Sequence, residues 1–418
     1  MKLKSLNSQN DEAFPISIWL NMALILVVLG FIQIWVLTFY YQTKTNEWIS
    51  WIANDGNSGS PFAFGQHYFG DYLTMHNVAI SRDIQAFDNS YPPLGVIPFW
   101  LISWLPYRLG LYLWFGILGF SMLFPLFYSF YKTYPKFLVQ GIACLGVLTV
   151  PFISVMDRGN SVGLLTIFLF MFYLAYRRDK LHYASIFLGL AIGFKVYPLV
   201  IIPFLIVRKE FRLALLSFVY SIIFNLMAIL IWNRGNPLDG LKYSVNRIMD
   251  VEQLFKDGHG MYLSAAQVLT NFLNRVGLDH TFVGNFLIEN YKLVSATTLV
   301  YLLFGAYLSK GSNWILLMFS AIQLIPTISF SYYRVWSIAV VSIIILEHGR
   351  SSNSRSLSDV HKIWMTVSVL NLAPLPLLNF WPINLLPTLV VICILLIPLV
   401  ELKHKMESRL RQPSRSKI

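Results

Sequence analysis

Charged residues are scarce in this chain of 418 residues: they make up 12% of it, while hydrophobic residues make up 56%. A soluble globular protein carries about 25% charged residues, so this deficit excludes an ordinary soluble domain. Mean hydropathy is +0.59. Apolar windows of about 20 residues, the length that a helix needs to cross a membrane, recur along nearly the whole chain. The composition therefore predicts an all-α integral membrane protein.

Cysteine is also scarce, since Cys144 and Cys393 are the two in the chain, and each lies inside an apolar run. Neither has the spacing of a metal ligand or a disulfide, so both are interpreted as packing residues. The chain lacks the Asp-x-Asp pair with which nucleotide-sugar enzymes hold a metal ion. No cofactor is predicted, and the need for a divalent metal is left open.

The net charge of +12 does not indicate nucleic-acid binding. Most Lys and Arg residues lie in short connectors and in the tail 402–418, where they attract anionic lipid head groups and set orientation. That tail has six basic residues and one acidic residue, and it is predicted to be cytoplasmic. The lipid bilayer is therefore an expected partner and nucleic acid is not. The composition favours a bacterial plasma membrane.

About twelve transmembrane helices are expected within one polytopic domain, 1–418. The expected spans are 17–40, 92–107, 109–131, 137–156, 161–176, 183–206, 213–232, 291–309, 313–331, 335–347, 362–380 and 383–401. Simple alternation places five basic residues of the first half on the outer face, against the usual bias. They are Lys132, Lys136, Arg177, Arg178 and Lys180. Either some spans there are short broken helices, or the bias is weak in this region.

Two extramembrane segments are long enough to have structure of their own. The first, 41–91, contains two basic and five acidic residues and is predicted to be an outward loop. The second, 233–290, has apolar residues at three- and four-residue steps, which predict amphipathic helices along the bilayer surface on the outer side.

Polar residues that interrupt the apolar pattern are the candidates for chemistry. Asp157, Arg158 and Asn160 share the turn MDRGN, which is either a helix cap with an internal ion pair or a functional cluster. Lys195 stands in the apolar run GFKVYPLV, where an ammonium is costly unless it binds an anion, pairs with a carboxylate or extends to the interface. Arg334, with Tyr332 and Tyr333, marks a third interruption, which is either an interfacial belt or part of a site.

Three of these patterns together resemble glycosyltransferase family 87. They are Tyr-Pro-Pro-Leu at 91–94, the turn Arg-Gly-Asn at 158–160, and GLAIGFKVYPLVIIPFLIVRKEFR at 189–212. The resemblance covers about 65–215 and implies a fold of the GT-C superfamily, with a polyprenyl-phosphate sugar, typically mannose, as donor. A fainter likeness links the chain to the mannosyltransferase that adds the first mannose to glycosylphosphatidylinositol.

The resemblance also implies roles for individual residues. An acidic residue of the first outward loop acts as catalytic base, and the matching context GDYLTMHNVAI points to Asp71, with Asp88 and Asp83 as alternatives. Lys195, Arg158 and Arg334 would bind the donor phosphate. The remaining residues expected to bind substrate are Tyr91, Asn160, Tyr197, Tyr332 and Tyr333.

The implied reaction is an inverting single displacement that moves a hexose to a glycan or glycolipid acceptor on the outer face. Asp71 would take the proton of the acceptor hydroxyl while the cations stabilise the leaving lipid phosphate. A transporter or lipid-carrier flippase is an alternative, since it would also show buried charge and broken helices. An oligosaccharide ligase or polymerase, with its main active loop late in the chain, is another.

Overall fold

The computed structural model describes residues 16–45, 69–86, 91–254, 264–326, 334–350, 359–373 and 385–410, and every regular element in these ranges is helical. The first half contains α1 (Ile16–Thr45), α3 (Gly70–Ser81), α4 (Pro93–Ile102), α5 (Tyr107–Thr133), α6 (Leu138–Ile142), α7 (Val150–Arg158), α8 (Gly163–Tyr176) and α9 (Leu181–Phe194). The second half contains α10 (Ile201–Val207), α11 (Phe211–Trp232), α12 (Pro237–Leu254), α13 (Ala265–Arg275), α14 (Phe282–Glu289), α15 (Tyr291–Leu308), α16 (Asn313–Leu324), α17 (Trp336–Arg350), α18 (Asp359–Leu372) and α20 (Leu385–Leu410). Short 3-10 helices occupy Pro135–Phe137 and Tyr197–Val200, and a π-helical turn occupies Ala143–Val147.

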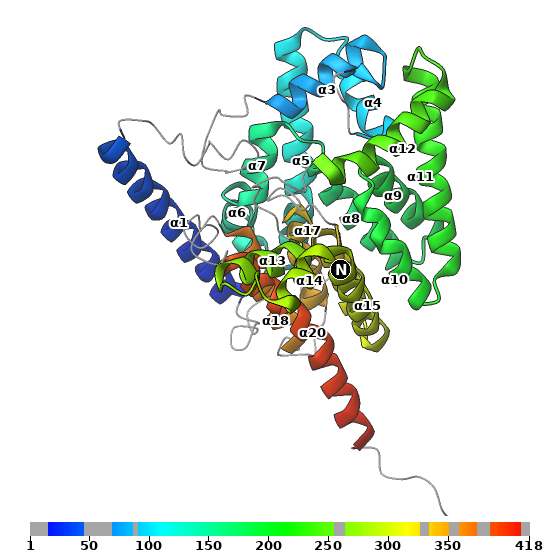
Figure 1. Ribbon diagram of the computed structural model, residues 1–418. Helices are drawn as coiled ribbons and strands as arrows, with labels where there is room; N and C mark the ends of the chain where they lie inside the picture. Colours follow the sequence, from blue (N-terminus) through cyan, green and yellow to red (C-terminus); the bar gives the residue numbers. More distant parts are fainter. Residues whose placement is uncertain are drawn as a thin grey trace, which may run out of the picture.

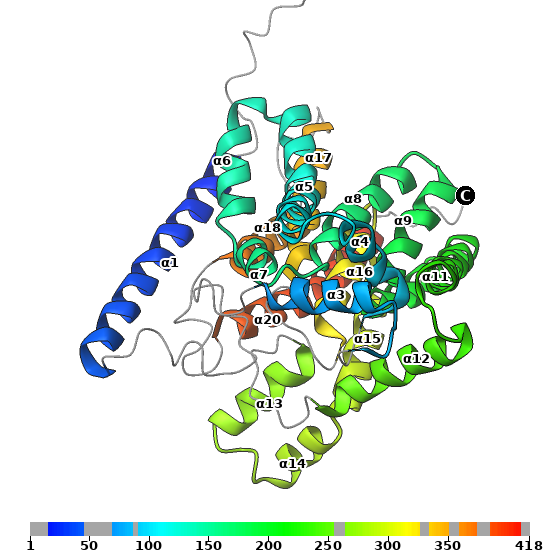
Figure 2. The same ribbon diagram turned by 90° about the horizontal axis from the view of Figure 1, so that it is seen from above.

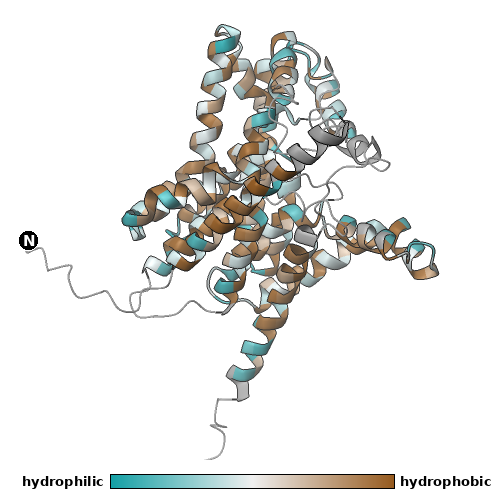
Figure 3. Ribbon diagram, turned by 90° about the vertical axis from the view of Figure 1, so that its left-hand side faces the viewer, coloured by the Kyte–Doolittle hydropathy of each residue, from teal (hydrophilic) through white to brown (hydrophobic). Residues whose placement is uncertain are grey.

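These helices pack around one apolar core, with α1 along its edge and α13 and α14 at its periphery (Figures 1 and 2). Large side chains such as Trp114, Phe172 and Trp336 are fully buried. Apolar residues also cover outward faces: Leu215 and Leu230 of α11 are 63% and 64% exposed. Figure 3 shows this hydrophobic colouring along most helices. Such faces suit a lipid environment, since hydrocarbon solvates apolar side chains without cost.

Four helices within the described ranges are long and apolar enough to cross a membrane. They are α1, α5, α11 and α15. The segments Pro135–Val147 and Val150–Arg158 form a fifth span if they are taken together, with a bend of 59° between them. Other apolar helices, among them α4, α8, α9 and α16, are shorter. The all-helical membrane architecture agrees with the prediction, whereas the count of twelve spans is not confirmed.

The expected span 92–107 contains α4, whose ten residues are fewer than a membrane crossing needs. Its first turn is bonded to the middle of α11, because Leu94 N donates to Asn225 Oδ1 at 3.0 Å. Near its other end, Trp100 lies beneath the guanidinium of Arg82, which donates to the carbonyl of Trp232 at the end of α11. The ten residues of α4 extend about 15 Å and run alongside the last turns of α11. The chain thus enters α5 from the end of the molecule where α11 finishes.

The basic connectors of the first half meet at the opposite end, together with the start of the C-terminal tail. Side-chain contacts join these connectors: Tyr134 Oη to His348 Nδ1 (2.7 Å), Arg177 Nε to Glu347 Oε1 (3.7 Å), Tyr176 Oη to Glu210 Oε1 (2.7 Å), Ser312 Oγ to Glu347 Oε2, and Asn313 Nδ2 to Glu401 Oε1 (2.6 Å). Simple alternation through twelve spans would place the partners of the first three contacts on opposite sides of the membrane. Of the two explanations left open for the first half, the structure favours short and broken helices: α4 is short, and 183–206 is broken at Lys195.

This arrangement predicts the side from which single cysteines react in membrane vesicles. In a chain whose Cys144 and Cys393 are replaced by alanine, Lys136→Cys and Lys403→Cys should be labelled by a membrane-impermeant maleimide from the same side. Asp83→Cys, next to the end of α11, should react from the other side. Labelling of Lys136→Cys and Asp83→Cys from one side would contradict the arrangement.

Candidate active site

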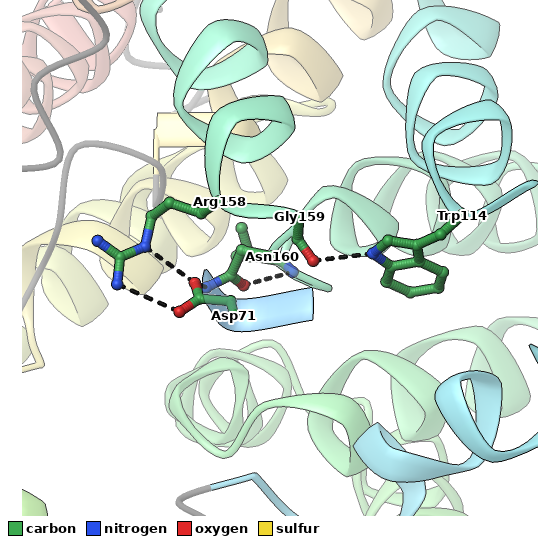
Figure 4. Close-up of polar contacts among 6 residues, drawn as sticks. Asp71, Trp114, Arg158, Gly159 and Asn160 are labelled. Atoms are coloured by element: carbon green, nitrogen blue, oxygen red, sulfur yellow. Dashed lines mark hydrogen bonds and ion pairs between the residues drawn. The ribbon is translucent and has the colours of Figure 1, made fainter. Parts of the chain in front are cut away.

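Asp71 lies in the first turn of α3, and two side chains from the turn after α7 hold its carboxylate (Figure 4). Arg158 donates twice, from Nε to Oδ2 at 2.9 Å and from Nη2 to Oδ1 at 3.2 Å. Asn160 Nδ2 donates to Oδ2 at 2.7 Å. A guanidinium that grips both carboxylate oxygens fixes their direction as well as their charge. The side chains of Arg158 and Asp71 are 21% and 20% exposed, so the pair lies at the edge of the interior.

The turn that presents Arg158 and Asn160 depends on Gly159. Its φ of 67° lies in the left-handed region, and a Cβ here would come within 2.7 Å of Tyr72 Cβ. Trp114 Nε1 donates to Gly159 O at 2.8 Å, and Asn160 Oδ1 accepts from Val162 N at 2.9 Å. Glycine alone combines this backbone conformation with such a close approach at little cost. The Arg-Gly-Asn sequence is thus explained by local geometry.

Helix α3 is fixed against the same turn. Phe69 N, just before the helix, donates to Asp157 O at 3.2 Å. The buried apolar residues of α3 recur at three- and four-residue steps and seat one face on the core. They are Tyr72, Met75, Val78 and Ala79. Asp71 falls beside this face and near the positive end of the helix dipole, which favours a carboxylate.

The surroundings of Asp71 act on its pKa in opposite directions. Burial raises the pKa, while the Arg158 charge and hydrogen bonds, the Asn160 hydrogen bond and the Lys195 charge lower it. The lowering effects prevail, so the pKa of Asp71 lies below its ordinary 3.8. The carboxyl is therefore ionised at neutral pH.

Lys195 occupies the break between α9 and the 3-10 helix that begins at Tyr197, where its backbone is extended. Pro198 has no N–H to continue the helical ladder of α9, so the chain leaves the helix here. The Lys195 ammonium lies 3.2 Å from the centre of the Tyr91 ring, as a cation–π pair. Because its charge also acts on Asp71, the two residues belong to one polar region.

The structure thus brings together five of the residues predicted from sequence: Asp71, Tyr91, Arg158, Asn160 and Lys195. Their roles stay predictions. Arg158 pairs with Asp71 of another helix, which goes beyond the helix cap considered for its turn.

The other predicted residues are placed differently. Asp83 is exposed beyond the far end of α3, where its carboxylate accepts from Gln85 N at 3.0 Å. Arg334 is buried and donates to Asn371 O at 3.3 Å, among polar side chains of α16, α17 and α18. Tyr197 is partly buried at the start of its 3-10 helix. Asp88, Tyr332 and Tyr333 lie outside the described residues.

Sequence reasoning missed Trp114 and Asn225. An indole in an aromatic-rich span gives no signal of its bond to Gly159. Asn225 does have a signal, since it is the one amide or charged side chain between Leu213 and Trp232. Among the described residues, no group of three or more His, Cys, Asp or Glu side chains is arranged to hold a metal ion.

Replacing Gly159 by alanine should destabilise the protein by about 1–3 kcal/mol, because φ is positive there and the new Cβ would collide with Tyr72. Gly116→Ala is the matched control, since Gly116 lies on an exposed face of α5 with no atom within 4 Å of the added carbon. Thermal unfolding in detergent measures both. Equal melting temperatures for the two variants would contradict this explanation of the turn.

Asp71 should contribute to stability in a defined pH range. Because its folded pKa is depressed, the contribution is complete above the unfolded value of 3.8 and is lost as the pH falls through the folded pKa. Above this value, the free energy of unfolding of wild type should exceed that of Asp71→Asn by roughly 1–3 kcal/mol. The variant loses the charge that pairs with Arg158 at this position. The difference should shrink below pH 3.8. Unfolding at several pH values tests this, and a constant difference would contradict it.

Comparison with known proteins gives the family. Residues 89–325 match the model of glycosyltransferase family 87, a range that covers more than half of the chain. Tyr91, Arg158, Asn160 and Lys195 fall inside the match, and Asp71 precedes it. No curated protein and no solved structure matched. The resemblance seen in the sequence is confirmed, and the chain belongs to glycosyltransferase family 87, as a membrane glycosyltransferase.

Proposed function

We propose that this glycosyltransferase moves a hexose, mannose by the family resemblance, from a polyprenyl-phosphate sugar to a glycan or glycolipid acceptor. The observation that carries the proposal is one polar region. In it, Asp71 contacts Arg158 and Asn160, and the charge of Lys195, at the break after α9, acts on the Asp71 carboxylate. A carboxylate and two cations in one place are the groups that such a transfer needs.

The class of donor is proposed from the surroundings of the two cationic side chains, Lys195 and Arg158. A lipid phosphate is an anion joined to a long apolar chain, so its site needs positive charge beside an apolar surface. Lys195 and Arg158 provide the charge, and α4, α9 and α11 are apolar helices next to Lys195. The cations would stabilise the phosphate as it leaves, in a partly water-excluded site where charge interactions are strong.

In the proposed reaction the acceptor hydroxyl attacks the anomeric carbon from the side opposite the phosphate. The new bond joins the acceptor oxygen to that carbon, and the bond from carbon to phosphate oxygen breaks with its electron pair going to the phosphate. Asp71 accepts the hydroxyl proton, and the sugar inverts its configuration.

The Asp71–Arg158 pair adds a condition to this scheme. While Arg158 holds both carboxylate oxygens, Asp71 is a weak base, because its pKa is lowered. A donor phosphate attracts the same guanidinium. We infer that donor binding draws Arg158 from Asp71 to the phosphate, so that the carboxylate becomes a stronger base when the donor is in place.

The same proposal assigns the polar region to the outer face. The basic connectors 132–136 and 177–180 and the last turns of α20 lie at the other end of the molecule. Positive connectors favour the cytoplasmic side. Asp71 would therefore lie on the outer face of a bacterial plasma membrane. The transporter and ligase alternatives explain neither the family match nor the carboxylate at this position.

Asp71→Asn should lower sugar transfer at least about 100-fold, because the amide cannot accept the proton. The assay uses purified protein in vesicles with polyprenyl-phosphate mannose and other lipid-linked and nucleotide-linked sugars. Asp83→Asn is the control and should keep its activity, since Asp83 is exposed at the far end of α3. Full turnover by Asp71→Asn would move the base to another residue, and transfer from nucleotide sugars alone would exclude the donor class.

A further inference from the structure

Asn225 is an isolated amide in a helix that is otherwise suited to lipid. It lies on α11, one of the four helices apolar enough to cross a membrane. It is also the one amide or charged side chain between Leu213 and Trp232. An amide in such a helix costs free energy unless its oxygen and nitrogen are hydrogen-bonded. The bonds that Asn225 makes therefore indicate why it is there.

Those bonds join three helices. Asn225 Oδ1 accepts from Leu94 N at 3.0 Å, and Nδ2 donates to Gly193 O at 3.3 Å and to Ser221 O at 2.9 Å. Leu94 N is among the first N–H groups of α4, which have no partner within their own helix. Gly193 O belongs to the last turn of α9, just before the backbone becomes extended at Lys195. One side chain thus satisfies backbone groups that the start of α4 and the end of α9 leave open.

The two helix ends approach each other closely around this amide. A Cβ on Gly193 would lie 2.8 Å from Leu94 Cδ2 and 3.1 Å from Asn225 Nδ2. A Cβ on Gly95 would lie 3.2 Å from Phe194 O. All three distances are tighter than ordinary van der Waals contact, so glycine on each side permits the approach.

The segments held in this way carry the cation–π pair of the site. Tyr91 precedes Leu94 by three residues, and Lys195 follows Gly193 by two. The Lys195 ammonium stands 3.2 Å from the Tyr91 ring centre, a geometry that depends on how the two backbones lie.

We propose that Asn225 is a positioning residue of the donor-phosphate site, which acts by fixing the end of α9 against the start of α4 and thereby the Lys195 ammonium over Tyr91. The inference rests on the proposed function, in which Lys195 binds the donor phosphate. Asn225 itself does not touch the reacting atoms. Its loss weakens binding of the phosphate and leaves binding of the acceptor unchanged.

The test measures binding of geranyl phosphate, a short isoprenyl phosphate, to the full chain in detergent by titration of tryptophan fluorescence. Lys195→Met should weaken binding at least about tenfold, because a charged contact is lost. Asn225→Leu should weaken it about tenfold, and the double variant Asn225→Leu/Lys195→Met should bind no worse than Lys195→Met. Such non-additivity is expected if Asn225 acts through Lys195. Ser221→Ala, which loses a bond within α11 alone, is the control and should bind as wild type.

The outcomes separate the two proposals. If Lys195→Met weakens binding and Asn225→Leu does not, the positioning role is wrong and the proposed function stands. Additive losses in the double variant would also overturn it, since Asn225 would then act independently of Lys195. If Lys195→Met binds as wild type, both proposals fall.

A second variant covers the case in which Asn225→Leu does not fold. In Gly95→Ala the added Cβ would lie too close to Phe194 O and the Tyr91 ring. The variant thus disturbs the contact between α4 and the end of α9 without removing the Asn225 amide. It should weaken geranyl phosphate binding, with no added loss in combination with Lys195→Met. In a transfer assay it should raise KM for the donor and leave KM for the acceptor unchanged. Unchanged donor binding by Gly95→Ala would overturn the inference.

Discussion

The ion pair between Asp71 and Arg158 is the interaction on which the site is organised. A carboxylate near the protein interior is expensive to desolvate, and a lone guanidinium there is equally so. Bonded to each other, and with Asn160 on one oxygen, both remain charged. The turn after α7 and the start of α3 must meet for this to happen, and the bond from Phe69 N to Asp157 O joins them directly.

The start of α4 and the end of α9 form the other side of this polar region, with Tyr91 and Lys195. A lipid-embedded chain can interrupt a helix where other groups take up the open backbone bonds. The start of α4 and the end of α9 come together, and an amide from α11 bonds to both. The breaks place Tyr91 and Lys195 away from regular helix, where their side chains face one another. Continuous spans would have left no such position for an ammonium.

The sequence indicated which polar residues lie together better than it indicated the path of the chain. Arg158, Asn160 and Lys195 interrupt apolar runs, so the cost of burying them made them visible, and the resemblance to family 87 added Asp71. The course of α4 was not predictable in this way, because an apolar stretch of this length suits a buried short helix as well as part of a span. Its course along α11 depends on bonds to residues more than 100 positions away, such as that between Leu94 and Asn225. For the same reason, alternation through twelve spans separated the basic connectors of the first half from the end of α20, whereas the structure places them at one end of the molecule.

The π-helical turn Ala143–Val147 and the 59° bend after it precede the helix that ends in Arg158. Each residue of an α-helix rotates the next side chain by about 100° about the helix axis, and a π-turn accommodates one extra residue within a helix. Thr149, between the π-turn and this helix, has extended backbone and interrupts the helical phase, so the direction of Arg158 is set by its own helix and by the contacts at the end of that helix. The segment 143–147 can therefore change in length while the contacts at the end of the helix keep the guanidinium on Asp71.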